Sequence, residues 1–259
     1  MGWFGKLIGG TAGFFIGGPF GAVLGTVLGH SFDKRAELQK SGEYNTYSRW
    51  DRGSSQKFTA NDQSQMIFFV ATFSVLGKMA AAGSGISNAG IKAIEGFIDR
   101  DLRLTLAEKQ FAMRIVTTSA ASLEPFEKFA QQFYSLFYKQ PQMLQTMYDI
   151  LYKVATADNT LSTDEEKILD SAANIFNLKN RERGASYRTG SSDKSYSVLG
   201  CKKTDSNDVI KSAYKKLIKD FHPDTIASKG LPEEFTKFAS QKFTEINQAY
   251  EEIRKERGF

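Results

Sequence analysis

Few residues in this 259-residue chain are suited to chemistry: it has two histidines, His30 and His222, and one cysteine, Cys201. His222 is followed by Pro223 and Asp224, which places an imidazole close to a carboxylate in the chain. A Ser-His-Asp hydrolase or a zinc site with several histidine ligands would have to use these two histidines, which argues against an enzyme. One cysteine excludes an intramolecular disulfide and any cysteine-rich metal site. We therefore expect no catalytic residue, no bound metal and no cofactor.

A helix that ends near Phe221 must position the His-Pro-Asp triplet. Pro223 disfavours the helical conformation for the residue before it, so His222 is expected at the tip of a loop. On a helical wheel, apolar residues share one face of this helix and lysines the opposite face, which we call the lysine ridge. The apolar face holds Ile210, Ala213, Tyr214, Leu217, Ile218 and Phe221, and the lysine ridge holds Lys211, Lys215, Lys216 and Lys219.

A second helix follows Leu231 and Pro232, with apolar residues from Phe235 to Ile253 at spacings of three and four. We expect it to pair with the first helix as an antiparallel hairpin, with the triplet in the connecting loop. Taken alone, the lysine ridge is also consistent with a solvated face, and the triplet with a plain turn that a proline terminates.

The order of these features resembles the J domain of DnaJ-type co-chaperones. The resemblance covers residues 194–259 and rests on Tyr196-x-Val-Leu-Gly200, the basic helix, the triplet, and Lys242-Phe-x-x-Ile-Asn-x-Ala-Tyr250. It implies a partner, an ATP-driven chaperone of the DnaK type. It further implies that the lysine ridge binds an acidic surface of the chaperone ATPase, and that His222, Pro223 and Asp224 contact the junction of its two parts. There Asp224 would pair with an arginine and favour ATP hydrolysis.

The middle of the chain, residues 58–180, has helical periodicity and no lasting strand-like alternation. Thr105 with Glu108, and Ser162 with Glu165, predict capping boxes at helix starts, and Pro125 and Pro141 predict first turns. The aromatic residues between Phe126 and Phe137 follow helical spacing and are expected in the core.

An internal repeat with an offset of 75 residues aligns the segment from Leu76 with the segment from Leu151. A helix, a short turn and a second helix are thus expected twice, a pattern that resembles the TerB-like family of tellurite-resistance domains. In that family acidic turn residues can bind metal. Here the second copy keeps Asp158 and Glu165, whereas the first has glycine at both places, Gly83 and Gly90. A hard cation needs several oxygen ligands, so we interpret Asp158 and Glu165 as helix-capping residues.

The first 32 residues contain an uncharged stretch from Leu7 to Gly29, long enough to cross a bilayer as one helix. Six of its glycines repeat every four residues and form what we call the glycine row: Gly9, Gly13, Gly17, Gly21, Gly25 and Gly29. Such a row lets two helices approach closely in lipid, which predicts a homodimer. A segment lying on the membrane surface and an unordered glycine-rich arm are the alternatives. His30 is interpreted as an interfacial residue.

Charge predicts the orientation and excludes some partners. One lysine precedes the apolar stretch and four basic residues follow it closely, so the C-terminal parts are expected in the cytoplasm and the N-terminus in the periplasm. A formal net charge of +5 with 24% charged residues is too mild for a dedicated nucleic-acid binder.

We therefore expect an all-α chain with five parts. These are a transmembrane anchor (1–32), a linker (33–57), a TerB-like helical domain (58–180), a second linker (181–193) and a J domain (194–259). The combination resembles the family of DnaJ-like membrane co-chaperones, which implies a place in the bacterial inner membrane. The alternative from another class is a TerB-like metal-sensing or stress-sensing membrane scaffold whose J domain is vestigial.

Overall fold

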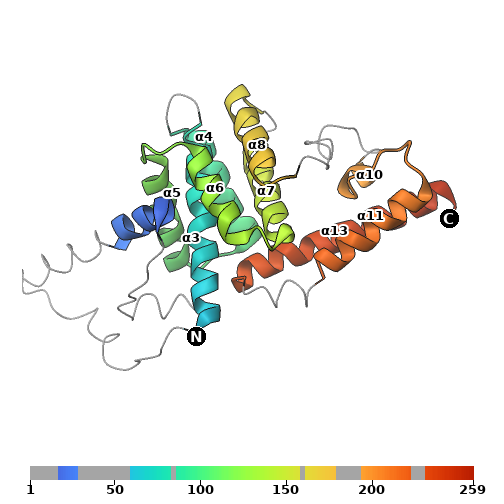
Figure 1. Cartoon of the computed structure of the whole chain (residues 1–259), viewed down its shortest axis with the longest axis horizontal. Coiled ribbons are helices and arrows are strands. Elements are labelled where there is room, and N and C mark those ends of the chain that lie inside the picture. The colour runs from blue at the N-terminus through green and yellow to red at the C-terminus, as the bar shows by residue number, and fades with distance from the viewer. Residues whose placement is uncertain (1–16, 29–58, 83–85, 158–160, 179–193, 223–230) are drawn as a thin grey trace, which may run out of the picture.

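The computed structural model describes residues 17–28, 59–82, 86–157, 161–178, 194–222 and 231–259, and every regular element within these ranges is a helix (Figure 1). The all-α prediction is confirmed. Besides a short N-terminal helix over residues 18–28, the helices are α3 (Ala60–Ala80), α4 (Asn88–Phe97), the π-helix η1 (Ile98–Leu102), α5 (Leu106–Ala120), α6 (Phe126–Phe137), α7 (Pro141–Ala155), α8 (Thr163–Ile175), α10 (Lys194–Val198), α11 (Asn207–Asp220) and α13 (Glu233–Arg257).

The helix starts follow the sequence signals. Both predicted capping boxes are present, at Thr105 before α5 and at Ser162 before α8, and a further one at Thr59 opens α3. Pro125 is the N-cap residue of α6, and Pro141 is the first residue of α7. In each capping box a side chain satisfies a backbone N–H that the helix itself leaves unpaired.

The internal repeat is confirmed in space. Helices α3 and α7 end at Ala80 and Ala155, and α4 and α8 follow the N-cap residues Ser87 and Ser162, so both boundaries recur at the offset of 75 residues. Helices α3 to α8, which we call the bundle, share one apolar core. Helix α3 is the central helix and is buried over most of its length. The predicted core aromatics of α6 lie against it; for example, the ring centres of Phe133 and Phe68 are 6.0 Å apart.

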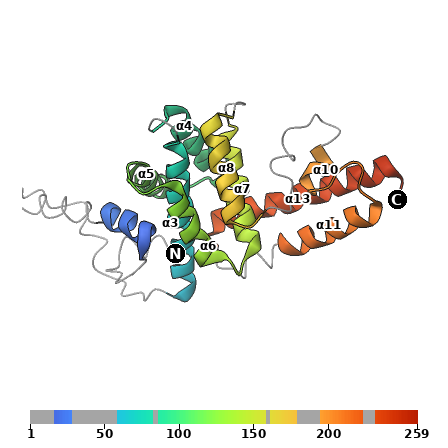
Figure 2. The same ribbon diagram turned by 45° about the horizontal axis from the view of Figure 1, so that its top comes forward.

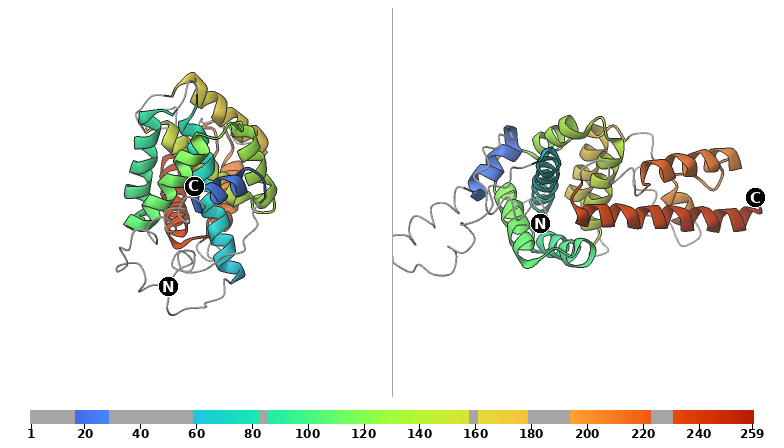
Figure 3. Two further views of the ribbon diagram at one scale, coloured as in Figure 1. Left: turned by 90° about the vertical axis from the view of Figure 1, so that its left-hand side faces the viewer. Right: turned by 90° about the horizontal axis from the view of Figure 1, so that it is seen from below.

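Helix α13 joins the bundle to the C-terminal helices. It runs from the bundle along α11 to the C-terminus, as all three views show (Figures 1, 2 and 3). Its N-terminal part buries Phe235, Phe238 and Ala239 in the core of the bundle, together with Leu231, which lies just before the helix. Its C-terminal part buries Ile246, Ala249 and Ile253 in a second core with Ile210 and Leu217 of α11. The sequence had predicted one apolar face of α13 against α11, whereas the structure divides that face between two cores.

The helix over residues 18–28 packs on the bundle. Phe20, Val23, Leu24 and Val27 are buried there. The side chain of Gln132 accepts a hydrogen bond from the Phe20 N–H at 3.0 Å and donates one to the Gly17 carbonyl at 2.6 Å. The sequence had placed these apolar side chains in lipid; in the structure, protein side chains cover them instead.

Within the described residues, no helix has both the length and the apolar character needed to cross a membrane. The other residues of the predicted span lie outside the described ranges, and with them Gly9, Gly13, Gly29 and His30.

Candidate functional site

The lysine ridge lies on α11, whose N-terminus is capped by the Ser206 side chain accepting from the Val209 N–H. Lys215, Lys216 and Lys219 are exposed, and Lys211 is partly covered because its Nζ lies 4.7 Å from the centre of the Phe259 ring. The structure therefore presents basic groups along one side of a single helix, where an acidic partner surface can reach them.

The opposite face of α11 fixes the helix to α13. Tyr214 stacks on Tyr250 with ring centres 3.8 Å apart and rings 8° from parallel, and its hydroxyl donates to the Asn247 side chain at 2.9 Å. Burial raises the pKa of Tyr214 above its ordinary value, so the hydroxyl, which is protonated at neutral pH in any case, remains a donor to still higher pH. The helix that carries the lysine ridge is thus fixed to α13 through its opposite face.

His222 follows the end of α11 and is exposed. Its ring meets the ring of Phe243 edge to face, at a centre-to-centre distance of 5.8 Å and an angle of 88°. The structure therefore places His222 at the same end of the hairpin as Lys219. Pro223 and Asp224 lie outside the described residues.

Two residues of the hairpin have roles that were not assigned from the sequence. Phe243, which supports His222, carried a usable signal because it falls within the helical apolar spacing of α13. Arg257, near the end of α13, joins that helix to α10 and to the loop before α11. Helical spacing does not distinguish Arg257, because the groups that accept its hydrogen bonds lie far away in the sequence.

The candidate metal ligands of the bundle divide between described and undescribed residues. Glu165 is a capping residue, as predicted: its Oε2 accepts from the Ser162 N–H at 2.9 Å and from the Ser162 hydroxyl at 2.7 Å. Asp158 lies outside the described residues. In the part of the chain that the structure describes, no three His, Cys, Asp or Glu side chains gather as metal ligands do.

Gly90, the counterpart of Glu165 in the first copy of the repeat, lies at a tight packing contact. A Cβ atom there would lie 3.1 Å from the Cα of Ala80 at the end of α3, closer than most Cβ atoms approach a neighbour. The first copy thus brings α4 so close to α3 that a side chain at position 90 would push against its backbone.

Comparison with known families gives three matches along the chain. Residues 1–56 match the co-chaperone DjlA transmembrane domain, residues 69–186 match the tellurite resistance protein TerB, and residues 194–257 match the DnaJ domain. No solved structure matches the chain.

Curated relatives match over their whole length. Co-chaperone protein DjlA of Escherichia coli (strain K12) is 29% identical over 100% of both chains. The protein of that name from Photobacterium profundum is 28% identical over 98% of this chain and 99% of its own, and that from Coxiella burnetii is 27% identical over 99% of both. Three domain matches in this order, together with relatives that span the whole chain, make this protein similar along its full length to the co-chaperone protein DjlA.

Proposed function

We propose that this protein recruits a DnaK-type chaperone to the bacterial inner membrane and stimulates its ATP hydrolysis. The observation that carries the proposal is the exposure of both the lysine ridge and His222 on one rigid hairpin within the DnaJ domain match. The protein supplies no catalytic group of its own. It shifts the chaperone toward the conformation that hydrolyses ATP, an effect of binding energy rather than of chemistry in this chain.

The lysine ridge and the triplet have separate tasks in this mechanism. Lys211, Lys215, Lys216 and Lys219 attract an acidic surface on the chaperone ATPase, an interaction between exposed charges that salt screens. His222, Pro223 and Asp224 contact the junction between the nucleotide-binding and substrate-binding parts. There Asp224 pairs with an arginine.

ATPase measurements with the full-length protein in lipid nanodiscs test this proposal. The parent protein should stimulate a DnaK-type ATPase several-fold, and His222→Gln should abolish the stimulation while circular dichroism stays unchanged, because His222 is exposed. Lys215→Gln with Lys216→Gln should instead raise the concentration needed for half-maximal stimulation and weaken its dependence on salt. Stimulation by His222→Gln equal to that of the parent would overturn the assignment.

The membrane arrangement is part of the same proposal. The basic residues that follow the apolar stretch support a cytoplasmic location for the bundle and the DnaJ domain. Protease added outside spheroplasts should leave the chain beyond Lys34 intact, and digestion of the DnaJ domain there would demonstrate the opposite orientation.

Two chains pair through the glycine row in this proposal. Gly17 and Gly25 are exposed, and a Cβ atom at either position would meet nothing within 4 Å. Gly25 lies on the side of this helix away from the side chains that face the bundle, and Gly17 directly precedes the helix. These two positions of the glycine row are thus open to a second helix.

A further inference from the structure

The first turns of α13 are part of the bundle core, although they also begin the second helix of the hairpin. The ring of Phe235 is fully buried and meets three rings of α3 nearly edge to face: Phe68 at 5.0 Å, Phe73 at 6.1 Å and Phe69 at 6.3 Å. At the same end the Gln65 side chain donates to the Leu231 carbonyl at 3.3 Å. Phenylalanine burial of this kind stabilises by several times the thermal energy.

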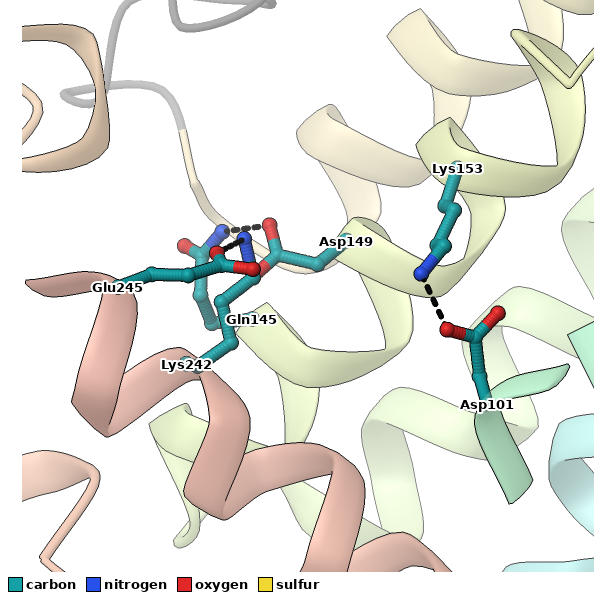
Figure 4. Close-up of polar contacts among 6 residues, drawn as sticks. All are labelled: Asp101, Gln145, Asp149, Lys153, Lys242 and Glu245. Carbon is teal, nitrogen blue, oxygen red and sulfur yellow. Dashed lines mark hydrogen bonds and ion pairs between the residues drawn. The ribbon is translucent and has the colours of Figure 1, made fainter. Parts of the chain in front are cut away.

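One turn further along, Phe238 is held by two other elements of the bundle. Its ring meets that of Phe97 at 5.5 Å and 88°, and the Nζ of Lys153 lies 5.6 Å from its centre. That Nζ also pairs with Asp101 Oδ1 at 2.5 Å (Figure 4). This ion pair fixes Lys153 over the Phe238 ring. Helix α13 is therefore fixed in rotation as well as in position.

The last contact between α13 and the bundle is polar. Lys242 lies between two carboxylates: its Nζ is 3.9 Å from Oδ2 of Asp149 on α7 and 3.1 Å from Oε2 of Glu245 one turn along α13. The Gln145 side chain donates to the other oxygen of Asp149 at 3.0 Å (Figure 4). The side chains of Lys242 and Asp149 are only 18% and 12% exposed, so water screens this pair less than a surface pair.

The residue after Lys242 is Phe243, whose ring supports His222. The contact between Asp149 and Lys242 therefore fixes α13 one residue away from Phe243, the residue that contacts His222. The lysine ridge is not covered by this arrangement, since Lys215, Lys216 and Lys219 remain exposed. Contact with the bundle is thus compatible with chaperone binding.

We propose that the bundle is the platform that positions His222, and that Asp149 is a positioning residue acting through Lys242 and Phe243. This inference rests on the proposed function for its effect on ATP hydrolysis, but the position of His222 can be measured without it. In this scheme the lysine ridge determines how tightly the chaperone binds. The platform determines how strongly the triplet stimulates ATP hydrolysis once the chaperone is bound.

Three variants of the full-length protein in nanodiscs test the platform. Asp149→Asn removes the bundle's charge that faces Lys242 and leaves Glu245 in place, whereas Asp149→Glu keeps both charges. Asp164→Asn is the matched control, because Asp164 pairs with Lys167 on α8 at 48% exposure. The ring signals of His222 in NMR spectra, identified by their loss in His222→Gln, report its position. Hydrogen exchange along α13 reports how firmly the helix is held.

We expect Asp149→Asn to move the His222 signals and to speed exchange around Lys242. We further expect it to lower maximal stimulation of the chaperone by about two- to fivefold with little change in the half-saturating concentration. Asp164→Asn should match the parent, and Asp149→Glu should lie closer to the parent than Asp149→Asn.

Unchanged His222 signals and unchanged maximal stimulation in Asp149→Asn would overturn the platform, as would equal effects of Asn and Glu at position 149. A parent protein that fails to stimulate the ATPase would instead refute the proposed function. The His222 signals would still show whether the bundle positions His222.

Discussion

At the scale of single residues, the guanidinium of Arg257 links three parts of the hairpin through hydrogen bonds and a ring contact. Its guanidinium lies 4.9 Å from the centre of the Tyr196 ring, and it donates four hydrogen bonds. The acceptors are the Tyr196 hydroxyl at 2.8 Å, the carbonyls of Asp205 at 2.7 Å and Lys203 at 2.6 Å, and the Asn207 side chain at 3.0 Å. One side chain thereby joins α10, the loop before α11, and the end of α13.

We predict that Arg257→Lys lowers the free energy of unfolding by about 1–3 kcal/mol, because one ammonium cannot reproduce a planar fork that serves four acceptors. Urea denaturation followed by circular dichroism measures the change. Arg254→Lys is the control, since Arg254 is on the same helix and makes fewer contacts in an exposed setting: its Nε donates to the Phe259 carbonyl and its Nη1 lies 3.5 Å from Oε1 of Glu251. Equal effects of the two substitutions would show that the connections of Arg257 add no stability.

The sequence could not have revealed this role for Arg257. Its acceptors lie 50 to 61 residues away, and two of them are backbone carbonyls that any residue type provides. The lysine ridge and the capping residues could be predicted, because helical spacing within a few residues determines which face a side chain occupies and which N–H it can reach.

At the scale of helices, Gly77 sets the distance between α3 and α5. A Cβ atom at this position would lie 2.0 Å from Oγ of Ser119 and 2.3 Å from the carbonyl oxygen of Val116. The second of these is backbone, which cannot turn aside as a flexible side chain can. The central helix of the bundle therefore touches α5 at a point where only glycine fits.

We predict that Gly77→Ala destabilises the protein by about 1–3 kcal/mol, because overpacking outweighs the gain in helix propensity. Gly96→Ala is the matched control: Gly96 is also within a helix, but a Cβ atom there would meet the flexible guanidinium of Arg100. The control should be neutral or stabilising in thermal unfolding. A Gly77→Ala variant as stable as Gly96→Ala would contradict the close approach.

The helices of the repeat could be predicted from the sequence and the packing of α13 could not. The repeat gives two independent readings of each boundary, and its capping signals are local. The apolar residues of α13 keep one spacing from Phe235 to Ile253, so nothing in their order indicates that Phe238 faces the bundle and Ile246 faces α11. Which surface covers a helix depends on where the rest of the chain folds.

At the scale of the whole molecule, the N-terminal helix has two different faces. Phe20, Val23, Leu24 and Val27 lie against the bundle, while Gly17 and Gly25 have open space beside them. Among the described residues of this helix, the large apolar side chains are therefore already covered, and the face that carries Gly25 remains for a second chain.

We predict that Gly17→Leu with Gly25→Leu abolishes pairing of two chains. Leucine keeps the segment apolar and favours the helix by about 1 kcal/mol at position 25, so attachment to the membrane should survive. Close backbone approach should not, because the bulky side chains separate the two chains and remove the van der Waals contacts between closely packed helices. Crosslinking in membranes measures pairing.

Thr26→Leu is the control for this prediction. Thr26 is exposed on the same helix but lies about 100° around the axis from Gly25, so the added bulk falls outside the glycine row. This variant should crosslink like the parent, whereas the glycine double variant should lose both the crosslinked dimer and its activity in cells, with its DnaJ domain unaltered. If the double variant crosslinks as well as the parent, the open face of this helix serves a purpose other than pairing, and the dimer must form elsewhere on the chain or not at all.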